Sequence, residues 1–597
     1  MNILGLSFFY HDAAAALLMN GVPVAMSEEE RFSRKKHDSD FPELAINFVL
    51  KKGGISAKDV DYVVFYEKPF IKLDRIMKTD LATFPIAPHV FVASIKSLFL
   101  KKIWIRQIIS SRLGIDPGKV LFVEHHLSHA ASAFLPSPYD QAAILTIDGV
   151  GEWAVTTIGV GDGKKVKILK EIHFPHSLGL LYSAFTAFLG FEVNDGEYKV
   201  MGMAPYGKPK YADLVRRTIR FFPDGSYDLD LSYFSFHRSL SRTYSGKFIE
   251  LFGPPRDPKS KFFTRETGWP SYFGEKPQGK EFERIALEQE HYADIAASVQ
   301  AVLEEAVILL AKEARRITGL SKLCFAGGVA LNSVANGKIL KNAGFDEIFI
   351  QPAAGDAGGA LGAALLVWNQ ALGNERSYKM EHAYYGAEYS ENDIKSFLDS
   401  NKIEHQYFKN EEALFDLIAR EIANGKVIGW FDGKFEWGPR ALGSRSILGD
   451  PRRSEMKDVV NTKIKFREPY RPFAPSVLVE EADKFFDLPE PKKYYPARFM
   501  LYVVDVLKDK QEIIPAITHV DGTARPQTVF REHSPRYYGL IKKFSDITGV
   551  PLILNTSFNL KGEPIVNTPA DAYSTFERSE LDILVLKDFV VYKNKKE

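Results

Sequence analysis

The sequence begins with NILGLSFFYHDAAAALLMNGVPVAMS (residues 2–27), which predicts three consecutive strands. Apolar runs at residues 2–8 and 22–27 flank a run of small residues at 12–19. The last two runs are joined by Asn20-Gly21, a strong signal for a tight hairpin because both residue types accept a positive φ. We therefore expect an antiparallel meander at the start of the chain.

The same design recurs further along the chain. Apolar runs at residues 142–148 and 153–160 are followed by a Gly161-Asp162-Gly163 turn and a third run at 166–172. Two copies of strand, hairpin and strand predict a duplicated α/β unit, which is the organisation of the actin-like (ASKHA) ATPases, whose two similar subdomains close over a nucleotide. A chance likeness between two β-meanders is the alternative, because hairpins are common.

A glycine pair lies where a phosphate group could bind. An amphipathic helix expected at 292–316 leads into an apolar strand at 322–325, and Gly327-Gly328 follows directly, before a second helix. Glycines at such a turn allow backbone N–H groups to approach phosphate oxygens at a helix N-terminus. A tight turn explains the pair equally well, and the sequence does not contain the P-loop pattern.

Two histidines and two aspartates form a candidate metal site. His125 and His129 are four residues apart, so on a helix they face the same way, whereas His126 points roughly 100° aside. Asp148 ends an apolar strand, and Asp356 lies in a glycine-rich turn. Two imidazoles and two carboxylates suit iron, zinc or manganese. The alternative is that the histidines are ordinary polar residues near the start of a helix.

The composition limits the class of protein. The 597 residues are 45% hydrophobic and 26% charged, which is typical of a globular protein with large cores. Lys plus Arg (77) nearly balance Asp plus Glu (76), so neither a nucleic acid nor a membrane is an expected partner. The single cysteine, Cys324, excludes a disulfide within the chain and a cysteine-rich zinc site. Together with an N-terminus that does not resemble a signal peptide, this predicts a cytoplasmic protein.

The C-terminal part carries a local excess of positive charge. After a polar, aromatic stretch at 374–389, Ser390 is expected to cap a new helix. From residue 440 to 471 there are nine basic and four acidic residues, interleaved with prolines and glycines. Such a cluster in a neutral protein favours a small polyanion as ligand, although ordinary surface arginines would account for part of it.

Five motifs, in one order, carry a family resemblance. They are HHLSHA at 125–130, DG at 148–149, EYKVMGMAPYG at 197–207, GGVALN at 327–332 and GPRALG at 438–443. With these motifs the chain resembles the NodU/CmcH/TobZ O-carbamoyltransferases essentially from end to end.

The resemblance implies two domains. Residues 1–372 would form an actin-like domain similar to the catalytic subunit of tRNA threonylcarbamoyladenosine synthase, with an insertion at about 205–289. Residues 373–597 would form a YrdC-like α/β domain. The insertion is rich in aromatic residues, most of which we expect in a small core of their own, with stacking on a ring-containing acceptor as the alternative.

The resemblance also assigns site residues in the first domain. The metal ligands would be His125, His129, Asp148 and Asp356, and the metal is usually iron, with zinc or manganese as alternatives. His11 matches a general base near the acceptor. Lys199 would steady developing negative charge, a structural or surface lysine being the alternative. The residues matched to nucleotide binding are Gly327, Gly328 and Asn332.

In the second domain the resemblance implies contacts to carbamoyl phosphate and ATP. These are Arg440, Lys465, Arg471, Arg525, Asn555 and Ser557. The expected activity is ATP-dependent O-carbamoyl transfer: the second domain, with Mg²⁺, would form carbamoyl adenylate, and the first would pass the carbamoyl group to a hydroxyl of a small molecule, a natural product of secondary metabolism.

The expected partners are this hydroxyl acceptor, whose identity stays open, and, as an open alternative, a second copy of the chain in a homodimer. A tRNA-modifying carbamoyltransferase and a non-catalytic actin-like regulator are the other functions to weigh. The balanced net charge argues against the first of these, because a tRNA-binding enzyme should carry a basic stripe.

Overall fold

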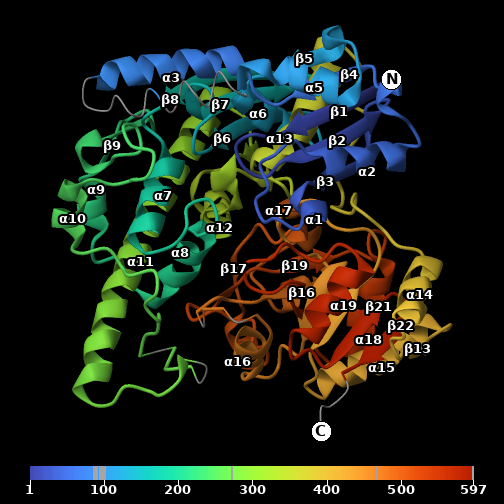
Figure 1. Ribbon diagram of the computed structural model, residues 1–597. Helices are drawn as coiled ribbons and strands as arrows, with labels where there is room; N and C mark the ends of the chain where they lie inside the picture. Colours follow the sequence, from blue (N-terminus) through green and yellow to red (C-terminus); the bar gives the residue numbers. More distant parts are fainter. Residues whose placement is uncertain are drawn as a thin grey trace. The chain divides into compact units, whose positions relative to one another are not determined.

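The start of the chain folds into the expected meander in the computed structural model, which describes residues 1–84, 92, 102–265, 267–270, 273–465, 467–468 and 470–593. Three antiparallel strands continue into two parallel ones, in the order β3-β2-β1-β4-β5 (Figure 1). Their bounds are β1 (Asn2–Ser7), β2 (Ala14–Met19), β3 (Val22–Glu28), β4 (Tyr62–Phe65) and β5 (Val120–Phe122). Asn20 and Gly21 have positive φ angles of 50° and 80°, as a tight hairpin requires.

A second sheet repeats the first strand for strand. Its order is β8-β7-β6-β11-β12, again an antiparallel meander followed by two parallel strands. The bounds are β6 (Gln141–Ile147), β7 (Ala154–Asp162), β8 (Lys165–His173), β11 (Lys322–Ala326) and β12 (Glu347–Phe349). The predicted duplicated α/β fold of the actin-like type is therefore confirmed.

Two helices rich in small residues pack between these sheets. Helix α13 (Asp356–Leu366) covers the first sheet, α6 (His125–Phe134) covers the second, and the two helices pack against each other. A Cβ on Gly362 would overlap the carbonyl oxygen of Ser128 in α6, and one on Gly5 in β1 would overlap the backbone of α13. Glycine at both positions allows backbone-to-backbone packing, which brings the first turns of α6 and α13 close together.

The long helix before β11 starts earlier than predicted. It is α11 (Lys280–Thr318), whereas the apolar periodicity that predicted its start begins only at Tyr292. Rings from the first part of the insertion pack into a core that they share with α7 (Leu178–Phe188), whereas Phe262 contacts Tyr470. Phe234 contacts Phe248 of α10 (Gly246–Phe252), and Phe248 also packs on Phe185 of α7.

By their contacts, the described residues divide into two units. The first contains Met1–Glu29, His37–Lys261 and Gly279–Met380. The second contains Glu381–Glu597 together with two segments from earlier in the sequence, Glu30–Lys36 and Phe262–Gln278. In the part of the chain that the structure describes, we find no helix of the length and hydropathy needed to cross a bilayer.

The second unit is built on a mixed sheet of eight strands, in the order β13-β22-β21-β14-β15-β20-β16-β19. Their bounds are β13 (Gln406–Tyr407), β14 (Ile428–Phe431), β15 (Arg445–Gly449), β16 (Ala474–Leu478), β19 (Gln527–Val529), β20 (Leu552–Ser557), β21 (Ile583–Leu586) and β22 (Phe589–Tyr592). The α/β class predicted for this part is confirmed.

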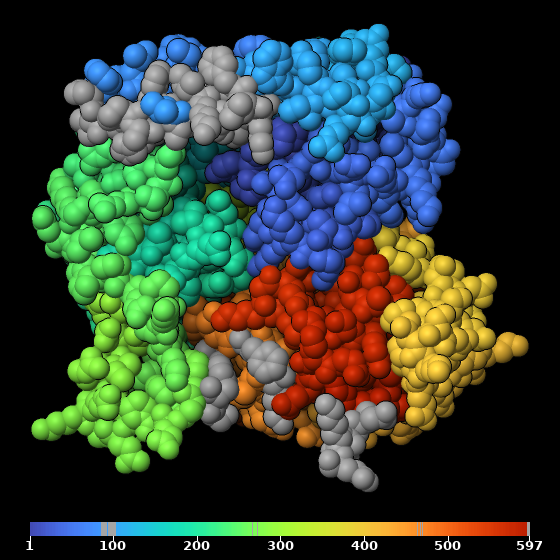
Figure 2. All heavy atoms as spheres, viewed as in Figure 1, coloured from blue at the N-terminus to red at the C-terminus, as the bar shows by residue number. Residues whose placement is uncertain are grey.

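Helices cover this sheet and close its surface. α18 (Pro535–Thr548) contacts β16 and β20 and packs on α15 (Glu411–Ala423), and α19 (Pro569–Glu577) contacts β14 and β21. The side chains of α19 and its neighbours, in red, form a continuous surface in the space-filling view (Figure 2). Ser390 caps α14 (Glu391–Ser400), because its Oγ accepts a hydrogen bond from the Asp393 amide at 3.1 Å. The predicted cap is confirmed.

Candidate functional site

The structure brings the four predicted metal ligands together in the first unit. His125 and His129 lie one turn apart on α6, Asp148 directly follows β6, and Asp356 is the first residue of α13. One ligand atom from each lies within 4.8 Å of the others, and all four side chains are buried. His126 points elsewhere, as predicted, with Nδ1 2.6 Å from the Thr146 hydroxyl.

The distances within this cluster fit a single cation. The Nε2 atoms of His125 and His129 are 3.0 Å apart. Asp148 Oδ2 lies 2.9 and 3.4 Å from these nitrogens, and Asp356 Oδ1 lies 3.6 and 3.4 Å from them. Two imidazole nitrogens this close need a proton or a cation between them, and two carboxylates supply the balancing charge. The donor set therefore suits a divalent cation.

His129 and Asp148 each stabilise the charged form of the other side chain. Burial lowers the pKa of His129, but hydrogen bonds and charge from Asp148 and Asp356 outweigh it and raise this pKa to about 9. Burial raises the pKa of Asp148, yet hydrogen bonds from His125 and His129 hold it well below its usual range. A divalent cation would replace the protons that these groups share.

Two residues that the sequence analysis did not select hold the cluster in place. The Glu152 carboxylate accepts hydrogen bonds from the backbone N–H of His125, at 3.0 Å from each oxygen, at the positive end of α6. The Tyr66 hydroxyl donates to Asp356 Oδ2 at 3.2 Å. Neither residue could be identified from local spacing, because each contact depends on the packing of separate strands and loops.

His11 lies beside the cluster within a chain of polar side chains. Its Nε2 is 4.0 Å from Asp356 Oδ2, and its Nδ1 is 3.0 Å from Asp12 Oδ2. The other oxygen of Asp12 lies 2.7 Å from Nδ1 of His37, whose Nε2 is 3.2 Å from Asp195. Burial lowers the pKa of His11, but the charge of Asp356 and the hydrogen bond with Asp12 raise it to about 9.

Lys199 joins the far end of this chain. Its Nζ lies 3.4 Å from Oδ2 of Asp195, which precedes Lys199 by four residues. Lys199 also lies 5.8 Å from the ring centroid of Tyr198. The structure thus connects Lys199 to His11 through Asp195 and His37, rather than directly to the metal ligands.

The glycine motif lies against Asp148. Gly327 has φ of 92°, and a Cβ there would overlap the carbonyl oxygen of Ile147. The Gly328 N–H donates to Asp148 Oδ1 at 2.9 Å. Asn332 caps α12 (Ser333–Asn342) through its side-chain oxygen, which accepts from the Ala335 amide at 3.1 Å. Of the predicted nucleotide-binding residues, Gly327 and Gly328 therefore lie beside the predicted metal ligand Asp148, whereas Asn332 bonds to Gln300 and to the start of α12.

The second unit contains a cation cluster, which we define as Arg440, Lys465, Arg467, Arg471 and Arg525. Burial lowers the pKa of Lys465 well below its ordinary value, and the charges of Arg467 and Arg471 lower it further. Burial also lowers the pKa of Arg525. The positive charges of Arg440, Arg467 and Arg471 lower the pKa of Arg525 further. Mutual repulsion among these cations means that a bound polyanion would stabilise them.

Lys465 is held by neutral oxygens. Only 3% of it is exposed, and its Nζ donates to the hydroxyl and carbonyl oxygens of Ser557 and to the carbonyl and Oδ1 of Asn559, at 2.9 and 2.6 Å for the latter two. Of the residues that form this site, Asn559 and Arg467 were not selected from the sequence. Asn559 belongs to the polar run at the end of β20, which was the available signal.

The loop that carries Arg440 is fixed by buried polar side chains. Glu436 Oε1 accepts hydrogen bonds from the backbone N–H groups of Leu442 and Ser444 at 2.8 and 2.7 Å. Asn555 Nδ2 donates to the Ala441 carbonyl at 3.1 Å, and Gln527 Nε2 donates to that of Leu442 at 2.7 Å. Asn555 thus positions the loop, in addition to any contact it makes with a ligand.

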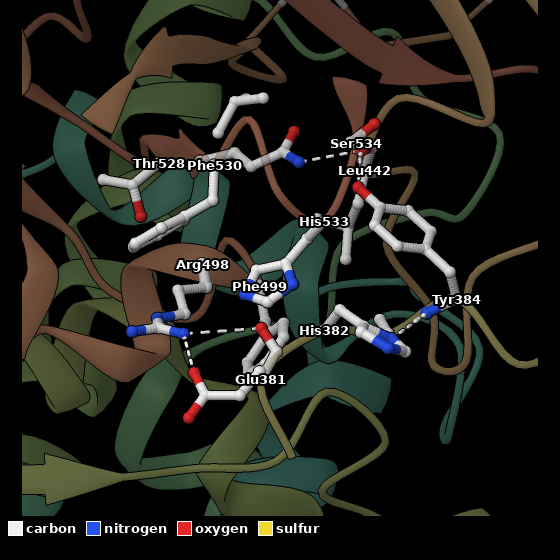
Figure 3. Close-up of a pocket in the computed structure, with 13 residues that line it drawn as sticks. Glu381, His382, Tyr384, Leu442, Arg498, Phe499, Thr528, Phe530, His533 and Ser534 are labelled. Atoms are coloured by element: carbon white, nitrogen blue, oxygen red, sulfur yellow. Dashed lines mark hydrogen bonds and ion pairs between the residues drawn. The ribbon is translucent and has the colours of Figure 1, made fainter. Parts of the chain in front are cut away.

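A small recess in the second unit is lined in part by Leu442 (Figure 3). His382, His533 and Tyr384 line it, and the Tyr384 hydroxyl donates to the Leu442 carbonyl at 2.8 Å. The recess has room for about one water molecule, which is too little for a substrate. Burial lowers the pKa of His382 to about 4, so this ring is neutral at pH 7.

Comparison with known proteins covers both units. A family model described as the carbamoyltransferase N-terminus matches residues 2–365, and one described as the carbamoyltransferase C-terminus matches residues 419–593. An uncharacterized protein of Synechocystis is 46% identical over 99% of this chain and 97% of its own length. The nodulation protein NolNO of Sinorhizobium fredii is 38% identical, over 98% of this chain and 79% of its own. The 3'-hydroxymethylcephem-O-carbamoyltransferase of Streptomyces clavuligerus is 31% identical, over 45% of this chain and 48% of its own.

Proposed function

Because the chain belongs to the carbamoyltransferase family and is a transferase, we propose that it activates carbamoyl phosphate with ATP and passes the carbamoyl group to a hydroxyl of a small molecule. The observation that carries this proposal is the cation cluster. A buried lysine held only by neutral oxygens, beside several guanidinium groups, is costly unless an anion neutralises it. Carbamoyl phosphate and the triphosphate of ATP are anions of the required size.

In the second unit, Arg440, Arg471 and Arg525 would bind phosphate oxygens, with Mg²⁺ as the counterion of ATP. Lys465 and Ser557 would orient the carbamoyl end through N–H and O–H donors. Water would first release phosphate from carbamoyl phosphate, leaving carbamate in the site. A carbamate oxygen would then bond to the α-phosphorus of ATP while the bond from that phosphorus to the bridging oxygen breaks, which gives carbamoyl adenylate and pyrophosphate. Fixed, desolvated cations favour this step because they neutralise charge on the transferring groups without reorganising.

In the first unit, His125, His129, Asp148 and Asp356 would hold a divalent cation, which we propose is iron. When bound, such a cation supplies Lewis-acid polarisation of a phosphate or carbamoyl oxygen. The backbone N–H groups at Gly327 and Gly328, together with Asn332, would hold the nucleotide.

In its neutral form, His11 would accept the proton of the attacking hydroxyl at Nε2, since Asp12 engages its Nδ1. The charge of Asp356 raises the pKa of His11, and a divalent cation held by Asp356 would offset that charge and favour the neutral ring. The oxygen of the acceptor then bonds to the carbamoyl carbon, the bond between that carbon and the adenylate oxygen breaks, and AMP leaves with the electron pair. Lys199 would add positive charge at the outer end of the His11 chain. The acceptor alcohol is proposed to be a natural product, and the name of the cephem carbamoyltransferase supports transfer to a hydroxymethyl group.

The test is AMP formation from ATP in the presence and absence of carbamoyl phosphate, with no acceptor added. We expect AMP and pyrophosphate to appear only when carbamoyl phosphate is present. A folded, metal-loaded protein that forms no AMP under these conditions would refute the proposal. Labelled carbamoyl phosphate can then be used to screen candidate alcohols for carbamoylated product.

A further inference from the structure

The second unit includes a segment from near the N-terminus of the chain. Residues Glu30–Lys36, which begin with the short helix α1 (Glu30–Ser33), belong to this unit by their contacts. In sequence they follow β3 and precede α2 (Glu43–Gly53), both of which belong to the first unit. The segment makes specific polar contacts with two loops of the cation cluster.

Arg31 holds the loop that leads to Arg440. Only 3% of Arg31 is exposed, and its Nη2 donates to the carbonyl oxygen of Gly438 at 2.8 Å. Its guanidinium also lies 4.8 Å from the ring centroid of Phe435. Gly438 has φ of 98°, a conformation that glycine adopts readily, so the bond from Arg31 secures the backbone two residues before Arg440.

Arg34 holds the loop that follows Ser557. Its Nη1 and Nη2 donate to the carbonyl oxygens of Ile565 and Pro564 at 2.6 and 2.9 Å. The same loop begins at Asn559, the residue that holds Lys465. Arg34 itself has φ of 59°, which costs a non-glycine residue about 1 kcal/mol and persists only where surrounding contacts over-determine the backbone.

The segment also adds charge to the site. Burial lowers the pKa of Lys465 most, and nearby positive charges, that of Lys36 among them, lower it further. The repulsion among these cations favours separation of the loops that carry them. Hydrogen bonds from Arg31 and Arg34 to carbonyl groups of the two loops oppose this separation. The carboxylates beside these two arginines are Glu30, 2.8 Å from Arg31, and Asp571, 3.6 Å from Arg34.

We propose that residues 30–36 are an integral part of the anion-binding site of the second unit, with Arg31 and Arg34 as positioning residues that keep its two cationic loops at the spacing a polyanion requires. The inference rests on the proposed function, because that function identifies the polyanion as carbamoyl phosphate with ATP. It extends that function by making the site of the C-terminal part depend on a segment located some 400 residues earlier in the chain.

The experiment compares full-length Arg34→Ala, Arg34→Lys and Arg31→Met with wild type, in acceptor-free AMP formation at varied carbamoyl phosphate. The control is Arg420→Ala, an exposed arginine on α15 that pairs with Asp416 at 2.8 Å. We expect a rise of about ten-fold or more in KM for carbamoyl phosphate in Arg34→Ala and Arg31→Met, with melting temperature close to wild type. Arg34→Lys, which keeps one charged donor, should recover part of the affinity.

The outcomes separate the two proposals. If wild type forms no AMP, the proposed function fails. If wild type is active but Arg34→Ala and Arg31→Met have the KM of Arg420→Ala, the proposed function stands and the positioning role is overturned. Should Arg34→Ala not fold, Arg31→Met decides the question alone, because methionine retains the apolar packing on Phe435, and an unchanged KM in that variant overturns the inference.

Discussion

The replacement of His129 by glutamine should remove the metal from the first unit while leaving the second unit active. Structural four-ligand zinc sites have apparent binding free energies of about 10–16 kcal/mol, so one ligand in four contributes roughly 3 kcal/mol, or about a hundred-fold in Kd. His126→Gln is the matched control. His126 is also buried on α6, but it bonds to Thr146 instead of facing the cluster.

The full-length proteins would be loaded with iron(II), manganese(II) or zinc(II), dialysed, and analysed for metal by mass spectrometry. Wild type and His126→Gln should retain roughly one equivalent per chain, and His129→Gln should retain little. Acceptor-free AMP formation should be equal in all three proteins, because we assign it to the second unit. The reasoning is refuted if His129→Gln and His126→Gln retain the same amount of metal, whether that amount is high or low.

Three further predictions concern the second unit. Arg525→Met should abolish carbamoyl-phosphate-dependent AMP formation yet raise the melting temperature by about 1–3 °C, because it removes a half-buried guanidinium that Arg440 and Arg471 repel; a lower melting temperature would contradict this. Glu436→Gln should lower the free energy of unfolding by about 1–2 kcal/mol, measured by urea titration, since a charged acceptor of backbone N–H groups is lost. For His382, whose pKa is lowered to about 4 by burial, the unfolded state binds more protons between about pH 4 and 6.5, so stability should fall as pH falls through this window. His382→Gln should show a smaller loss in urea titrations at pH 7 and pH 5, and an identical loss would count against the assignment.

The duplicated fold could be predicted because its signals are local. Alternating and apolar runs define strands, and Asn20-Gly21 defines the hairpin between β2 and β3. The pairing of His125 with His129 likewise follows from helix geometry over four residues. The error in the start of α11 has the same origin, since the polar run at residues 288–291 separates the apolar residues of its first turns from the periodic stripe that begins at Tyr292.

Other parts of the site depend on contacts between distant residues. Glu152 reaches the amide of His125, and Glu436 shapes the loop after Arg440, yet nothing in their sequence surroundings distinguishes them from ordinary surface carboxylates. The same holds for Asp12 and His37, which become partners only when the β1–β2 connection meets the stretch after α1. Local spacing carries no information about such pairs.

From its local patterns alone, the chain specifies the two meanders, the helix that carries His125 and His129, and the excess of positive charge after residue 440. The packing of the whole chain specifies which of those charges are buried and what holds them. Arg31 follows three glutamates and reads as a solvated residue, but it is 3% exposed and bonded to Gly438. Burial and long-range hydrogen bonds depend on which segments meet in space, and segments 400 residues apart share no periodicity through which the sequence could reveal that they meet.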